Sequence, residues 1–123
     1  MLISKSMINH FTRSFSDEDT IICYADSQTL SGASNKAILV MNDSTLHILF
    51  LNMTLTKVIQ QVELSFTDFH DETFSNNPFT LSSTWSFYTG KSKWRFRIMK
   101  KILTLGDMQK EFIIRIQENL SNQ

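Results

Sequence analysis

Glycine, proline and cysteine are scarce in this sequence, which has three, one and one of them among 123 residues. This composition excludes a mainly disordered or collagen-like chain. The single cysteine, Cys23, excludes an internal disulfide and a cysteine-rich zinc site. Apolar runs reach only about five residues, as in 37–41, whereas a membrane-spanning helix needs roughly 20. No secretion signal is evident near the N-terminus, so we expect one cytoplasmic domain over residues 1–123, without a transmembrane segment.

Charge is balanced in total but not along the chain. Twelve Lys and Arg cancel twelve Asp and Glu. Residues 1–76 have nine acids and four bases, a net charge of −5, whereas residues 77–123 have three acids and eight bases, a net charge of +5. The neutral total disfavours nucleic-acid binding through bulk positive charge. A polarised neutral domain instead favours association with a protein partner or with itself.

Helical periodicity is found at both ends of the chain. From Ile3 to Phe15, apolar residues recur every three or four positions, which predicts an amphipathic helix within residues 1–16. From Phe112 to Leu120 a second apolar stripe predicts a C-terminal helix over 107–120, with Asp107 as its N-cap.

The intervening residues 17–105 have the patterns of strands. Thr20–Ala25, Ala37–Met41 and Thr45–Leu51 are short apolar or β-branched runs, and Asn42–Ser44 predicts a tight turn between the last two. Residues 55–69 indicate one or two more strands. The polar segment 70–78 predicts a loop that ends at Asn77-Pro78.

Two later segments alternate most clearly. In Phe79–Tyr88, most odd positions are apolar, so Phe79 and Leu81 are expected to face the core together with the residues that follow at the same parity. In Lys93–Met99, aromatic and aliphatic side chains alternate with bases, and Thr89–Ser92 predicts the hairpin loop that joins the two strands. The whole chain then has about seven strands between two helices.

The strongest functional pattern lies in this last strand. Lys91, Lys93, Arg95 and Arg97 recur at every second residue, so on a strand they project from one face at intervals of roughly 6.6–6.8 Å. Such a ladder could bind phosphate groups, including those of an anionic lipid headgroup. A solvated sheet face also needs charge, and the same bases could pair with acids on neighbouring strands.

Catalytic and metal motifs are weak. The run Thr89–Ser92 ends like a phosphate-binding loop, but Trp85 stands where the motif needs glycine, and a strand follows rather than a helix. Asp68, His70, Asp71 and Glu72 could supply metal ligands, yet neighbouring residues rarely converge on one ion. We therefore predict no catalytic residues, metal or cofactor. A small hydrolase or isomerase that uses His70 with Asp68 or Asp71 as acid and base stays open as an alternative.

Three stretches together resemble a known family. They are Glu18–Ile22 before and within the first strand, Val40–Phe50 as a strand, polar turn and strand, and Trp94–Ile98 with the helix that follows it. The chain is similar in these stretches to small bacterial members of the pleckstrin-homology-like family. The resemblance implies a mainly β, α+β fold: a barrel of about seven antiparallel strands in two nearly orthogonal sheets, capped by the C-terminal helix. The N-terminal amphipathic helix is then an addition.

The resemblance implies a non-enzymatic scaffold, since the family offers no catalytic set to carry over. We expect a binding or assembly module whose partner is another protein or a second copy of the chain, with no nucleic-acid partner. Peripheral membrane or phosphate-ligand binding through the basic strand is the first alternative, and the enzyme centred on His70 is the second.

Overall fold

The computed structural model describes residues 3–15, 19–29 and 32–122. Glu18, at which the family resemblance begins, lies outside these residues. The described elements are, in order, α1 (Lys5–Phe11), the 3₁₀ turn η1 (Arg13–Phe15), β1 (Ile21–Ser27), β2 (Lys36–Met41), β3 (Thr45–Leu51), β4 (Val58–Ser65), the 3₁₀ turn η2 (Phe66–Asp68), β5 (Phe69–Ser75), β6 (Ser82–Thr89), β7 (Ser92–Met99), the 3₁₀ turn η3 (Leu103–Leu105) and α2 (Met108–Ser121).

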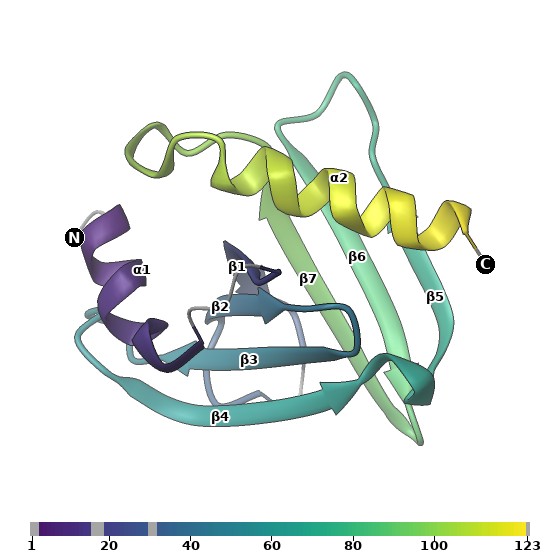
Figure 1. The fold of residues 1–123 in the computed structure, drawn as a ribbon, viewed down its shortest axis with the longest axis horizontal. Coiled ribbons are helices and arrows are strands. Elements are labelled where there is room, and N and C mark those ends of the chain that lie inside the picture. Colours follow the sequence, from purple (N-terminus) through teal and green to yellow (C-terminus); the bar gives the residue numbers. More distant parts are fainter. Residues whose placement is uncertain (1–2, 16–18, 30–31, 123) are drawn as a thin grey trace.

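All seven strands belong to one antiparallel sheet, in the order β4-β3-β2-β1-β7-β6-β5. The described residues do not close this sheet, because β4 and β5 each have one neighbouring strand. Figure 1 shows that β1–β4 run across the direction of β5–β7, with α2 over the opening between the two halves. The predicted mainly β class, with about seven antiparallel strands and a C-terminal helix, is confirmed.

The β2–β3 turn forms where the sequence predicts it, and its cause is Asn42. The Asn42 side-chain oxygen accepts hydrogen bonds from the backbone N–H groups of Ser44 (2.9 Å) and Thr45 (2.8 Å). Asparagine commonly bonds the backbone two residues further on in this way, which stabilises a turn locally. This turn fixes the register of the central hairpin, from Met41 opposite Leu46 to Lys36 opposite Leu51.

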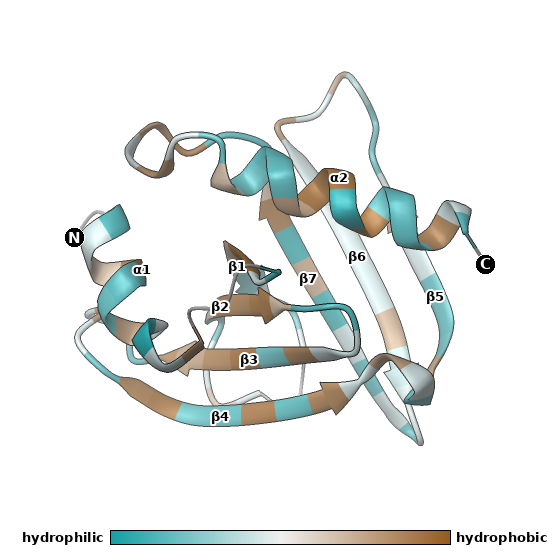
Figure 2. Ribbon diagram, viewed as in Figure 1, coloured by the Kyte–Doolittle hydropathy of each residue, from teal (hydrophilic) through white to brown (hydrophobic). Residues whose placement is uncertain are grey.

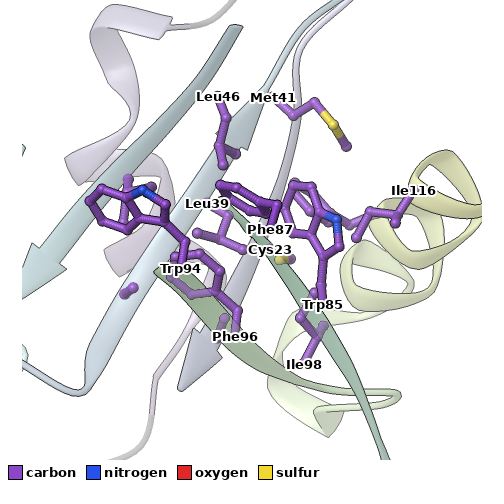
Figure 3. Close-up of a cluster of buried hydrophobic side chains, with 14 of the residues drawn as sticks. Cys23, Leu39, Met41, Leu46, Trp85, Phe87, Trp94, Phe96, Ile98 and Ile116 are labelled. Atoms are coloured by element: carbon purple, nitrogen blue, oxygen red, sulfur yellow. The ribbon is translucent and has the colours of Figure 1, made fainter. Parts of the chain in front are cut away.

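The main core fills the space between the sheet and α2 (Figure 3). The inward side chains of β7, predicted from alternation, are buried, and Trp94 is only 6% exposed. Both indoles are hydrogen-bonded: Trp85 Nε1 donates to Glu72 Oε2 and Trp94 Nε1 donates to Thr89 Oγ1, each at 2.8 Å. The inner face of α2 contributes Phe112, Ile113 and Ile116. The predicted alternation of buried apolar and exposed basic side chains along β7 is thus confirmed, and so is the packing of α2 against the sheet.

A second core lies on the outer face of the first strands. There α1, which begins at its N-cap Ser4, packs Ile8 against Ile38, Val40 and Leu49. Strands β2 and β3 are consequently buried on both faces, which explains why they are almost uniformly apolar (Figure 2). The sequence left open whether the N-terminal helix packs on the sheet or on another chain, and the described residues pack on the sheet.

The junction of β1 and β7 is short. These strands pair only at Asp26 with Arg97 and at Ser27 with Phe96, so the backbone of β1 soon separates from β7. Gln109 of α2 fills the gap: its Oε1 accepts from the Tyr24 N–H (2.8 Å), and its Nε2 donates to the carbonyls of Tyr24 (2.8 Å) and Met99 (3.0 Å). A fully buried side-chain amide therefore replaces the missing strand partner.

Three local predictions were wrong. The segment 70–78, predicted as a polar loop, contains most of β5, a strand at the edge of the sheet. Phe79 and Leu81 do not face the core, because β6 begins at Ser82; they are 94% and 80% exposed. Asp107 flanks α2, but its side chain makes no capping hydrogen bond.

Candidate functional site

The predicted anion-binding residues lie together on β7 and the turn before it. Lys93, Arg95 and Arg97 project from the exposed face of the strand, and Lys91 lies in the adjoining turn next to Gly90. Gly90 has a φ of 58°, a left-handed conformation that glycine adopts without strain. The spacing predicted from the sequence is therefore realised on the strand by Lys93, Arg95 and Arg97, whereas Lys91 lies in the turn before it.

Part of this row is already engaged within the chain. Arg97 donates to the Asp26 carboxylate at 2.8 Å, and Arg95 Nε donates to Gln28 Oε1 at 2.8 Å. Lys93 lies over the Tyr88 ring, with its Nζ 5.8 Å from the centroid. To bind a phosphate, Arg97 would have to release the Asp26 carboxylate or share it. The part of the row formed by Arg95 and Arg97 therefore already has hydrogen-bond partners within the chain. Whether the row binds an anion stays a prediction.

His70, the proposed catalytic acid or base, is held by two acceptors on the surface. Its Nε2 lies 2.9 Å from the Gly90 carbonyl oxygen and its Nδ1 lies 3.0 Å from Asp71 Oδ2. Both ring nitrogens can donate only when the imidazole is protonated, so the Gly90 carbonyl, followed by Asp71, raises the pKa of His70. Asp68 lies apart from this pair in η2 and is exposed. These two contacts hold the imidazole ring in place, and among the described residues both ring nitrogens are directed at groups of the chain itself.

Two of the hollows in the described surface include several polar residues in their linings. A groove of about 750 Å³ runs beside α1 and is lined by Ser6, Asn9, His10, Thr12, Arg13 and Ile22. A smaller one of about 210 Å³ lies at the open corner of the sheet, lined by Asp43, Phe66, Glu72, Trp85, Ile116, Asn119 and Asn122. Neither includes the basic ladder or His70. In the described part of the chain, no three His, Cys, Asp or Glu side chains gather as metal ligands would.

The outer edge of β4 offers backbone groups without a described strand partner. The Phe66 N–H donates to the Ser44 carbonyl at 3.0 Å, so Phe66 directs its backbone toward β3. In an antiparallel ladder this direction alternates, so the backbone groups of Gln61 and Glu63 point away from β3. Their side chains are exposed as well. The sequence indicated a strand here, but nothing local showed that it ends the sheet.

The other edge strand, β5, is interrupted. Its register with β6 shifts between His70 and Thr73, and Asp71 has a φ of 53°. Such a bulge is a common way to prevent pairing at a sheet edge. Strand β4 has an irregularity only near its start, opposite the Phe50–Leu51 step. From Gln60 to Ser65 its edge is regular and has neither proline nor lysine to block it.

Comparison with known proteins gives the fold. No family model matches the sequence, and no curated protein matches it. Among solved structures, the chain is similar to the hSac2 domain from human phosphoinositide phosphatase Sac2, with a TM-score of 0.52 and 11% sequence identity over 96% of this chain and 81% of that one. At this identity the likeness concerns the arrangement of strands and helices alone. It agrees with the mainly β architecture described above.

No helix among the described residues is sufficiently long and apolar to cross a lipid bilayer.

Proposed function

We propose that this chain is a non-enzymatic assembly module of pleckstrin-homology-like fold that pairs with a second copy of itself along β4. The regular edge of β4, which has no strand partner among the described residues, is the observation on which the proposal rests. The steep crossing of β1–β4 over β5–β7 and the helix over the opening support the family resemblance, in which the two halves act as two sheets of a barrel (Figure 1).

Pairing along this edge satisfies backbone groups that water otherwise solvates. An extended segment that adds to a sheet edge gains main-chain hydrogen bonds, and side chains of alternate residues then adjust the specificity. Val62 and Leu64 on the inner face of β4 are half-buried and pack against the main core, so a further strand would extend that core.

A second copy suits the charges of β4. If two β4 strands pair in antiparallel orientation about Gln61, each Gln61 lies opposite its equivalent, and Glu63 lies opposite Ile59, at the irregularity that precedes the regular part of the edge. The carboxylates therefore do not face each other directly, and the two glutamine amides can hydrogen-bond across the axis. Twofold pairing of one patch with itself is the commonest form of homo-oligomer. Because one strand pair is a small interface, we expect a weak dimer whose population rises with concentration.

The test is the mass in solution, measured by light scattering behind size exclusion over a range of concentrations. The wild-type chain should move from its monomer mass of 14.3 kDa toward twice that value. Gln61→Pro removes an outward-pointing N–H without touching the ladder to β3, so this variant should stay monomeric. Gln61→Ala keeps the N–H and serves as the matched control.

Two results would contradict the proposal. A wild-type chain that stays monomeric at every concentration excludes self-association. Equal dimerisation of the wild type and the proline variant excludes the β4 edge as its site. Fluorescence of the buried Trp85 and Trp94 shows in each case whether the proline variant is folded.

A further inference from the structure

The loop between β5 and β6 presents two large apolar side chains to solvent. Phe79 is 94% exposed and Leu81 is 80% exposed, although the chain has a well-filled core. Figure 1 shows this loop projecting beyond the end of the sheet, past α2, at the end of the molecule opposite β4. Two large apolar side chains exposed together on one loop are a candidate interaction surface.

Hydrogen bonds hold the loop in one shape. The Phe79 N–H donates to Asn77 Oδ1 at 2.9 Å, and Thr80 Oγ1 lies 2.9 Å from the carbonyl oxygens of both Asn77 and Ser82. The Lys100 ammonium also donates to the Asn77 carbonyl. Since the backbone is already ordered, the loop loses little backbone conformational entropy when the two apolar side chains are buried in a partner.

The sequence that follows the loop is rich in bases. Between Glu72 and Asp107 the sequence has no acidic residue. The same stretch has six bases, which are Lys91, Lys93, Arg95, Arg97, Lys100 and Lys101. Two of them are next to the loop, since the Lys100 N–H donates to the Leu81 carbonyl at 2.9 Å and Lys101 follows, exposed. The next turn, η3, also has an exposed apolar side chain, Leu103, which is 86% exposed.

From this geometry we infer that the β5–β6 loop docks the protein on an anionic lipid surface. Phe79 and Leu81 enter the boundary between headgroups and acyl chains, while Lys100 and Lys101 lie at the level of the lipid phosphates. Apolar burial combined with attraction to anionic lipid is the usual basis of reversible binding at a membrane surface. Charge complementarity is the reason to choose a lipid surface over an apolar protein groove, because Lys100 and Lys101 beside the loop attract a negatively charged bilayer.

Sedimentation with vesicles tests this inference. The wild-type chain should bind vesicles of phosphatidylcholine mixed with phosphatidylserine, and bind more weakly to phosphatidylcholine alone or at high salt. The double variant Phe79→Ser/Leu81→Ser should bind more than about tenfold more weakly. Lys101→Ala should weaken binding to the mixed vesicles about fivefold and leave binding to phosphatidylcholine alone unchanged.

Two control variants separate the loop from other surfaces. Met53→Ser changes an exposed apolar side chain (70% exposed) in the β3–β4 turn and should bind as the wild type does. Lys93→Ala/Arg95→Ala tests the basic ladder and should retain the dependence on the loop. The inference is overturned if the wild-type chain binds neither kind of vesicle, or if the double loop variant binds as well as the wild type does.

Discussion

Gln109 joins β1 to α2 and to the end of β7, so its replacement by leucine tests the architecture at its weakest junction. Leucine has a similar size but cannot form hydrogen bonds. The change removes three hydrogen bonds made by the buried Gln109 amide and leaves the Tyr24 N–H and the carbonyls of Tyr24 and Met99 without this partner.

The expected loss can be worked from these groups. A buried polar group that loses its partner costs about 1–3 kcal/mol, and the added apolar burial of leucine offsets part of the sum. We expect Gln109→Leu to lower the free energy of unfolding by about 3 kcal/mol, a large share of the about 5–15 kcal/mol that is typical of a small domain. Gln117→Leu makes the same change at an exposed position of the same helix and should alter it by less than about 0.5 kcal/mol.

Urea denaturation followed by tryptophan fluorescence measures both variants, because Trp85 and Trp94 are buried in the folded state. Hydrogen exchange adds a local measurement: the Tyr24 amide should lose protection in Gln109→Leu more than the amides of the central hairpin do. Equal losses of stability in the two variants, or a loss below about 1 kcal/mol in Gln109→Leu, would refute this role of the amide.

Two further predictions concern α1 and the surface histidine. Ile8→Ala removes the buried centre of the α1 contact and should cost about 2–4 kcal/mol in the same urea assay, well above the cost of Ile114→Ala at a partly exposed position; similar costs would mean that α1 docks only loosely. The raised pKa of His70 means that the protonated ring is favoured in the folded state, so its contribution to stability is present below the unfolded pKa and disappears as pH rises through the folded one. Asp71→Asn should lower the His70 pKa in an NMR titration, but leave part of the shift because the Gly90 carbonyl remains; an unchanged titration would show that the carboxylate has no influence.

The sequence predicts the regular parts of this fold because their signals are local. The central hairpin follows from two apolar runs and the Asn42 turn, and β7 follows from the alternation of bases with apolar residues. Both α1 and α2 follow from apolar spacing. In each case the side chains that form the element lie within a few residues of one another.

Strand β5 was missed because a bulge disturbs its alternation. Phe69 and Phe74 both pack against the main core, yet they are an odd number of residues apart, since the chain changes parity at Asp71. The polar residues between them then look like a loop. Phe79 and Leu81 were misplaced for the opposite reason: their parity matches Trp85, but pairing with β7 begins only at Ser82, after the chain has passed them.

The candidate surfaces could be predicted only in part. The row of bases on β7 is a property of one strand, so its spacing was enough to place it. Which bases have partners depends on β1, which is about 70 residues away in the sequence, and the free edge of β4 depends on the order of all seven strands. The sequence around Gln109 likewise gives no signal of its hydrogen bonds to Tyr24 and Met99, because these form only where two distant strands separate.

The short β1–β7 junction also has a consequence for how the protein is made. A ribosome releases the chain from its first residues onward, so β1 to β4 can pair as neighbouring hairpins while the rest is still being synthesised. The pairing of β1 with β7 joins residues about 70 positions apart, and the Gln109 amide that completes this junction is in the last helix. Until that helix has emerged, β1 and β7 are not joined, and the apolar core of the nascent domain is exposed to chaperones.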